Sequence, residues 1–184
     1  MDAIIGRKKE QKELARIYDS NKAEFVVVYG RRRVGKTYLV REFFQDRLAF
    51  YHTALSPLEL EADKLTEKQL QAFCFSLKRY GADVDRKPAD WFEAFEMLIT
   101  LLESKGNNKR LAIFIDELPW MDTPRSGFIT AFEHFWNGWA AGQKHIMLIV
   151  CGSATSWITD KLIQNIVVNT VITDGVSFLG REYI

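Results

Sequence analysis

The feature that most constrains the fold of this chain is the segment GRRRVGKT, Gly30–Thr37, which matches the phosphate-loop pattern G-x-x-x-x-G-K-[ST]. An apolar run typical of a buried strand, FVVVY, directly precedes it, and an amphipathic helical segment directly follows it. Backbone N–H groups at such a strand-to-helix turn point toward bound anions, and the helix dipole favours negative charge there. The surrounding elements therefore predict a loop that binds a polyphosphate, and a glycine-rich turn without a ligand is the lesser alternative.

The residues of this loop have different expected roles. Gly30 lets the chain turn sharply off the strand, and Gly35 allows a close backbone approach that a side chain would block. Lys36 is expected to reach the β- and γ-phosphates of a nucleotide, and the Thr37 hydroxyl is expected to coordinate Mg²⁺. The residues predicted to bind the nucleotide here are Gly30, Arg31, Arg32, Arg33, Val34, Gly35, Lys36, Thr37 and Tyr38.

The three arginines of the loop, Arg31 to Arg33, are not required by the motif. Solvated side chains at the rim of the site are one interpretation, and it is the one that we favour. The alternative is a direct role in binding nucleotide or nucleic acid, because guanidinium groups recognise phosphates.

A second motif, LAIFIDELPW, provides two carboxylates at the end of an apolar strand. Asp116 is placed to hold Mg²⁺, and Glu117 is placed to polarise the water that attacks the γ-phosphate. Ser153, in LIVCGSATSW, follows a further apolar strand. If that strand lies between the two motif strands, Ser153 can orient the water, and it can also cap the helix that follows. The predicted catalytic residues are therefore Glu117, Lys36 and Ser153, and the predicted metal ligands are Thr37 and Asp116.

Short apolar runs alternate with segments of helical periodicity, which is the pattern of a three-layer α/β fold with a parallel sheet. The predicted strands are Phe25–Tyr29, Leu48–Thr53, Leu111–Ile115 and Ile146–Cys151. The predicted helices are Lys8–Tyr18, Thr37–Phe44, Leu58–Tyr80, Trp91–Ser104, Phe128–Ala140 and Thr155–Gln164. The tail, Ile166–Ile184, is a candidate for a fifth strand.

The composition indicates an ordinary globular domain. The chain has 184 residues, of which 47% are hydrophobic and 27% are charged. A net charge of +1 gives no global field for nucleic acid or an acidic membrane, so such a partner would need a local patch. No run of about 18 apolar residues occurs, and the N-terminus lacks the apolar run of a signal peptide. We expect a cytoplasmic protein that does not contact membranes.

Five pieces of the chain, taken in order, resemble the archaeal-type ATPases, a family related to the AAA+ and STAND groups of P-loop NTPases. The pieces are IIGRKKEQKEL, EFVVVYGRRRVGKTYLVREFF, IFIDELPWMDTPRSGF, EHFWNGW and IMLIVCGSATSWITDKLI. They span Ile4 to about Asn165, and together they are far more specific than any one motif. In the terms of such ATPases, GRRRVGKT resembles the Walker A motif and IFIDE the Walker B motif.

The resemblance implies ATP and Mg²⁺ as ligands, a P-loop NTPase fold and a parallel sheet ordered 5-1-4-3-2. It also implies that an N-terminal segment lies against the adenine, and in this sequence that segment is Ile5, Gly6 and Arg7. The implied activity is hydrolysis of a phosphoanhydride bond of ATP.

The resemblance fades after Asn165. Residues 1–165 are therefore predicted to form an AAA+-like ATP-binding domain, and residues 166–184 an atypical C-terminal tail, which we interpret as a truncated or altered end. Members of the family usually continue into a helical lid, which supplies an arginine to the γ-phosphate, and then into a winged helix. The sequence shows neither, so it supports nucleotide binding by this chain more strongly than hydrolysis.

The predicted function is Mg²⁺-dependent ATP binding and hydrolysis, as the ATPase core of a regulatory or nucleic-acid-associated protein. One alternative is a nucleotide-binding scaffold without turnover, or an inert fragment. A second alternative is a small-molecule kinase of the same fold. Homo-oligomers or protein partners are compatible with this prediction, and nucleic acid would be bound only through C-terminal domains that the sequence lacks.

Overall fold

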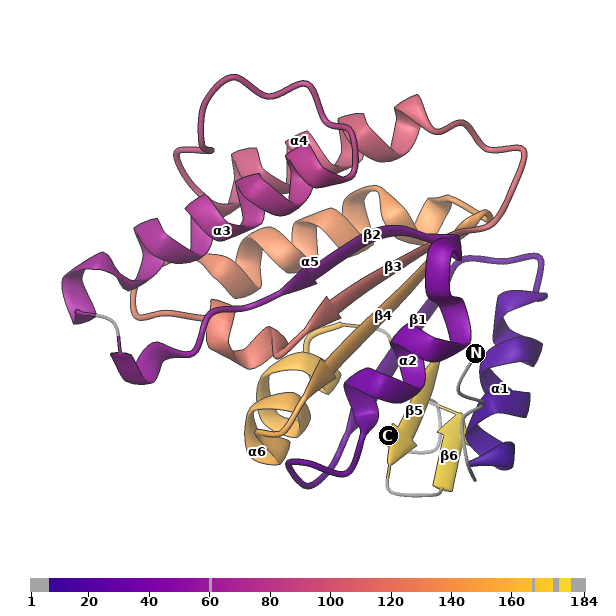
Figure 1. Ribbon diagram of the computed structural model, residues 1–184. Coiled ribbons are helices and arrows are strands. Elements are labelled where there is room, and N and C mark those ends of the chain that lie inside the picture. The colour runs from indigo at the N-terminus through magenta and orange to yellow at the C-terminus, as the bar shows by residue number, and fades with distance from the viewer. Residues whose placement is uncertain (1–6, 60, 167, 174–175, 180–184) are drawn as a thin grey trace.

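The computed structural model describes residues 7–59, 61–166, 168–173 and 176–179, which form a central sheet with helices on both faces (Figure 1). The strands are β1 (Glu24–Tyr29), β2 (Leu48–Thr53), β3 (Leu111–Asp116), β4 (Ile146–Gly152), β5 (Thr170–Thr173) and β6 (Val176–Leu179). They are ordered β2-β3-β4-β1-β5-β6. The first five strands in that order are parallel, so the predicted order 5-1-4-3-2 is confirmed. β6, which is antiparallel to β5, was not predicted.

Helices form the outer two layers. The helices are α1 (Lys8–Tyr18), α2 (Lys36–Phe44), α3 (Leu65–Arg79), α4 (Trp91–Ser104), α5 (Phe128–Gly138) and α6 (Thr155–Trp157), which continues as a π-helix over Ile158–Ile163. Short 3₁₀ turns cover Gln45–Arg47, Pro57–Glu59, Ala62–Lys64, Leu118–Met121 and Ala140–Gly142. In Figure 1, α3, α4 and α5 cover one face of the sheet, and α1 and α2 cover the other. None of the helices in the described ranges is long and apolar enough to cross a membrane.

The sheet contributes to a separate apolar core on each face, because successive side chains of a strand point to opposite sides. Phe25 of β1 belongs to the core under α5, whereas Val26 and Val28 belong to the core under α1 and α2. The ring centre of Phe25 lies 5.9 Å from that of Phe132 and 5.0 Å from that of Trp136, both on α5. The strand that precedes the phosphate loop is therefore fixed by packing on both of its faces.

Strand boundaries agree with the prediction to within one residue, and the helices differ more. α3 begins at Leu65 rather than at Leu58. The Gln69 side chain gives the reason: its Oε1 accepts a hydrogen bond from Leu55 N at 3.0 Å, and its Nε2 donates to Leu55 O at 2.8 Å. These bonds hold the chain before α3 close to the helix in an irregular path. The last predicted helix has one α-helical turn, α6, before the π-helix begins.

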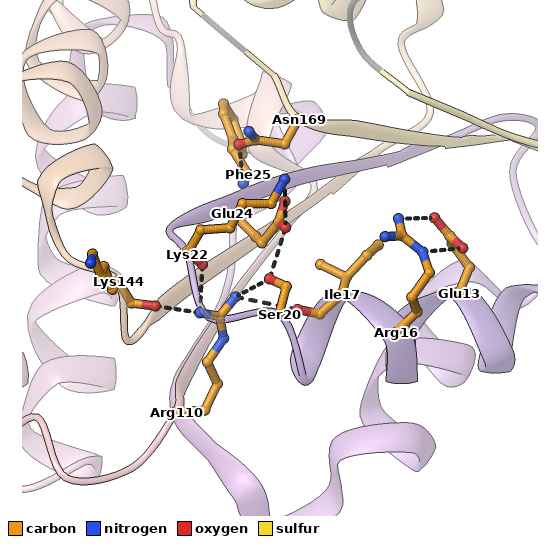
Figure 2. Close-up of polar contacts among 10 residues, drawn as sticks. All are labelled: Glu13, Arg16, Ile17, Ser20, Lys22, Glu24, Phe25, Arg110, Lys144 and Asn169. Carbon is orange, nitrogen blue, oxygen red and sulfur yellow. Dashed lines mark hydrogen bonds and ion pairs between the residues drawn. The ribbon is translucent and has the colours of Figure 1, made fainter.

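Arg110 connects several elements at the amino-terminal edge of the sheet (Figure 2). Its guanidinium donates to the carbonyls of Lys22 at 2.6 Å and Lys144 at 2.5 Å. It also donates to the carbonyl of Ile17 at 3.3 Å and to Ser20 Oγ at 3.4 Å. Arg110 directly precedes β3, and these partners lie in α1 and before β1 and β4, so one side chain fixes the starts of three neighbouring strands.

The tail joins the sheet through Asn169, the residue before β5 (Figure 2). Phe25 N donates to Asn169 Oδ1 at 2.8 Å, and Asn169 N donates to Phe25 O at 3.0 Å. Several tail residues are buried in the structure, namely Ile166, Val168, Thr170, Val171 and Ile172. The candidate fifth strand is confirmed, and it covers the edge of β1 that β4 leaves open.

We predict that Asn169→Ala lowers the free energy of unfolding by about 1 to 3 kcal/mol, because the substitution removes the acceptor for the Phe25 N–H. Urea denaturation followed by circular dichroism measures this change. Asn108→Ala is the matched control, since Asn108 is exposed and its side chain has no hydrogen bond to a described residue. We expect the control to change stability by less than about 0.5 kcal/mol. Equal values for the two variants would contradict the assignment.

Candidate functional site

Three segments that carry sequence motifs meet at the carboxyl-terminal edge of the sheet. β4 lies between β3 and β1, so the loops that follow these strands are neighbours. The segments hold Gly30–Thr37 after β1, Asp116 and Glu117 at the end of β3, and Ser153 after β4. The position of β4 meets the condition under which Ser153 was expected to approach the site.

The phosphate loop turns on residues with positive φ. Gly30 has a φ of 145° and Gly35 a φ of 77°, and glycine adopts such values without strain. A Cβ built on Gly35 would meet no atom within 4 Å, so open space adjoins the backbone there. Arg33 has a φ of 62°, which is uncommon for a residue with a side chain. The loop therefore has a tightly turned backbone with room for a ligand beside it.

Lys36 lies over its own loop, and only 7% of its surface is exposed. Its Nζ donates to the carbonyl of Gly30 at 3.0 Å and to that of Arg31 at 2.6 Å. An ammonium group has three N–H donors, so these two bonds leave one for a ligand. Carbonyl partners orient the ammonium without neutralising it, and the charge is available to an anion.

Thr37 and Asp116 form a direct contact between the phosphate loop and the acidic strand end. Thr37 Oγ1 donates to Asp116 Oδ2 at 2.9 Å, and the backbone N–H of Glu117 donates to Asp116 Oδ1 at 3.0 Å. Asp116 is 4% exposed. Both carboxylate oxygens are therefore fixed, and a hydroxyl and a carboxylate, the two predicted metal ligands, lie side by side.

Glu117 adopts a left-handed conformation with a φ of 52°. Its Oε2 accepts a long hydrogen bond, 3.5 Å, from Ser153 Oγ. Burial and then the adjacent Asp116 carboxylate raise the pKa of Glu117, while the charges of Lys36 and Arg32 act to lower it. A raised pKa makes a carboxylate a better proton acceptor, so this side chain has the electrostatic setting of a general base.

Arg32 has contacts that the sequence did not indicate. Its Nε donates to Ser153 Oγ at 3.1 Å, and its guanidinium carbon lies 5.7 Å from the ring centre of Trp120. Arg31, Arg32 and Arg33 are all exposed, as the favoured interpretation of a solvated rim requires. That interpretation is incomplete for Arg32, because the neighbouring loops hold its side chain in place.

Arg7 connects the N-terminal segment with the phosphate loop. Its guanidinium donates to the carbonyl of Val34, and its own carbonyl accepts a hydrogen bond from Gln11 N at 3.0 Å, in the first turn of α1. Ile5 and Gly6, which were predicted to contact adenine together with Arg7, lie outside the described residues. Tyr38 lies on α2 with 48% of its surface exposed.

Sequence reasoning missed Gly152, the last residue of β4. A Cβ built on Gly152 would lie 2.7 Å from Pro119 Cδ and 2.9 Å from Pro119 Cγ. The backbone of β4 therefore passes directly against the 3₁₀ turn that follows Glu117, and a side chain there would displace that turn. A glycine between an apolar run and Ser153 was the signal that could have revealed this contact.

The family model described as an ATPase domain predominantly from Archaea matches residues 4–167 of this chain. An uncharacterized protein of Methanocaldococcus jannaschii is 29% identical over 161 residues, which are 88% of this chain and 32% of that protein. An uncharacterized ATP-binding protein of the same organism is 44% identical over 44 residues, which are 24% of this chain and 75% of that protein. The chain thus spans about a third of the length of the first relative.

Solved structures share the fold. A Walker-type ATPase of Pyrococcus abyssi has a TM-score of 0.54 at 19% identity, over 86% of this chain and 48% of that one. Cdc6p of Pyrobaculum aerophilum has a TM-score of 0.59 at 14% identity, over 94% of this chain and 46% of that one. This chain therefore spans about half the length of each solved chain.

We predict that Gly152→Ala lowers the free energy of unfolding by about 1 to 3 kcal/mol, because the added methyl group overlaps the Pro119 ring. Denaturant unfolding measures the loss. Gly142→Ala serves as the control: a Cβ at Gly142 would meet nothing within 4 Å, and we expect a change below about 0.5 kcal/mol. If Gly152→Ala were as stable as the control, the prediction would be wrong, and the turn after Glu117 would move aside without a measurable loss of stability.

Proposed function

The chain belongs to the family of ATPase domains that occur predominantly in Archaea, and on this basis we propose that it binds Mg²⁺-ATP and hydrolyses the terminal phosphoanhydride bond. The observation that carries the proposal is the 2.9 Å hydrogen bond between Thr37 Oγ1 and Asp116 Oδ2. It joins the end of the phosphate loop to the end of the acidic strand. These are the two positions from which a P-loop NTPase holds its metal ion.

The phosphate loop and Lys36 would bind the phosphates of ATP. The loop leads directly into α2, so the unpaired N–H groups of the first helical turn and the helix dipole both favour an anion there. The Lys36 ammonium is already oriented over the loop by the carbonyls of Gly30 and Arg31. A phosphate oxygen would take its remaining N–H donor, so little reorganisation of this side chain is needed for binding.

Thr37 and Asp116 would hold Mg²⁺. A hydroxyl and a carboxylate are oxygen donors of the kind that Mg²⁺ takes, together with water and phosphate oxygens. When bound, the ion supplies positive charge that stabilises the negative charge developing on the phosphates. The contact between the two side chains and the bond from Glu117 N fix both donors, which supports this assignment.

Glu117 would act as the general base of hydrolysis. Its carboxylate accepts a proton from water while the water oxygen attacks the γ-phosphorus, and the bond from that phosphorus to the bridging oxygen breaks. Ser153, which donates to Glu117 Oε2, would orient the carboxylate. Because burial raises the pKa of Glu117, its carboxylate is a stronger base than that of an exposed glutamate.

We also propose that this domain is the ATPase core of a larger regulatory or nucleic-acid-associated protein. The lengths of the relatives support this, since the chain covers 32% of one and about half of each of two solved chains. Residues 1–165 contain every proposed site residue, and the described part of 166–184 adds β5 and β6 to the same sheet. Self-association, a protein partner and nucleic-acid contacts through segments outside this sequence belong to the same proposal.

We predict that Lys36→Ala weakens ATP binding by about 10-fold to 100-fold, because a charge-assisted hydrogen bond to a phosphate is lost. Calorimetric titration of the purified chain with Mg²⁺-ATP measures the affinity and the stoichiometry. Lys68→Ala is the control, since Lys68 is an exposed residue of α3. One-to-one binding that is equally tight in both variants would remove Lys36 from the site.

We predict that Glu117→Gln keeps ATP bound but lowers turnover by about 100-fold or more, because glutamine cannot accept the proton of the attacking water. Phosphate release measures turnover, and the same titration measures binding. Glu103→Gln, at an exposed position of α4, should match the wild type. Unchanged turnover in Glu117→Gln would remove Glu117 from the role of base. Saturable binding without turnover in the wild type would favour a scaffold, and phosphate transfer to an added acceptor would favour a kinase.

A further inference from the structure

We propose that Arg32 is a positioning residue for hydrolysis: it holds the Ser153 hydroxyl in place, and through that hydroxyl it holds the Glu117 carboxylate. The inference rests on the proposed function, because it takes Glu117 as the general base. It gives a role to a side chain that the phosphate-loop pattern leaves free, since the second variable position of the motif accepts any residue.

The contacts of Arg32 cross all three loops of the site. Arg32 extends from the loop after β1, and its Nε donates to Ser153 Oγ, after β4, at 3.1 Å. Ser153 Oγ lies 3.5 Å from Glu117 Oε2, after β3. The Arg32 guanidinium also lies over the ring of Trp120, three residues beyond Glu117, at 5.7 Å. A single side chain of the phosphate loop is therefore in contact with both of the other loops.

The direction of the hydrogen bonds gives Arg32 its effect. A serine hydroxyl has one proton to donate and two lone pairs that accept. Because the Arg32 N–H occupies a lone pair of Ser153 Oγ, the hydroxyl proton is left to point toward Glu117 Oε2. Without Arg32 the Ser153 hydroxyl can rotate toward other acceptors. Its proton is then no longer directed toward Glu117 Oε2.

Arginine suits this position for a reason of shape. A planar guanidinium can stack on an aromatic ring with its face while its Nε–H donates in the plane. The Trp120 ring and Ser153 Oγ are placed for these two contacts. Fixing an exposed arginine costs rotamer entropy, which the two contacts together offset. A lysine at this position would keep the charge but lose both the planar stack and the Nε donor.

The first test is Arg32→Ala in the full chain, with kcat and ATP affinity measured separately. We expect kcat to fall about tenfold and ATP affinity to change less than about threefold. Arg79→Ala is the control: it removes an exposed arginine of α3, outside the three loops of the site, and we expect its kcat to match the wild type. Equal losses of kcat in the two variants would overturn the inference, because they would not depend on the contact with Ser153.

Two further variants separate position from charge. Arg32→Lys keeps the positive charge but should leave kcat low, and full recovery of kcat by lysine would overturn the positioning role. In a double-mutant cycle, Arg32→Ala together with Ser153→Ala should have the same kcat as Ser153→Ala alone. Independent, multiplicative losses of kcat would show that Arg32 does not act through Ser153.

Glu117→Gln, measured in parallel, distinguishes the failure of this inference from that of the proposed function. If Glu117→Gln turns over like the wild type, the general base is elsewhere and both proposals fall. If Glu117→Gln is inactive while Arg32→Ala matches the wild type in kcat, only the role of Arg32 is overturned. Urea denaturation of each variant shows that the comparison is made on folded protein.

Discussion

The backbone hydrogen bonds that hold β3, β4 and β1 side by side are the constraint on which the candidate site depends. Their register places Tyr29 opposite Gly152, and Ile115 opposite Val150. All three strands are buried on both faces, so a shift of one residue would send each side chain to the wrong core. The three loops therefore begin at the same level of the sheet, and the placement of their polar groups follows from apolar packing rather than from contacts within the site.

The phosphate loop and the acidic strand end could be predicted because local chemistry limits their residue types. Position 35 has a positive φ, which glycine adopts without strain. Asp116 places a carboxylate at the end of an apolar strand, where apolar packing does not explain a charge. The strand order came from the family resemblance, since periodicity identifies elements and not their neighbours. Arg32 shows what local reasoning cannot reach: its bond to Ser153 joins residues 121 positions apart. The need for glycine at position 152 is also set by a residue far away in the sequence, because Pro119, in the turn after β3, leaves no room for a side chain there.

The two edges of the sheet have opposite chemistry. At the amino-terminal edge, α1 and α2 end, and Arg110 and Arg47 donate to the carbonyls of Ile17 and Phe44 in their last turns. These cations act in the structure as caps. At the carboxyl-terminal edge, α2 begins and presents N–H groups, and Lys36 keeps a donor for a ligand. The division follows from a parallel sheet with returning helices, and it separates the groups that stabilise the fold from those that would bind the nucleotide.

The strand that carries the phosphate loop is among the last to acquire its neighbours as the chain is synthesised. β1 is complete at Tyr29, but its partner strands begin only at Ile146 and Thr170. The bond between Phe25 and Asn169 spans 144 positions, and contacts of such range form slowly. On the ribosome, β1 therefore stays unpaired until β4 and β5 have been synthesised, with an apolar edge that is open to wrong partners. The phosphate loop would take its binding conformation only after the sheet is complete. ATP would therefore bind late in folding, and its binding would stabilise the native state of the nascent domain.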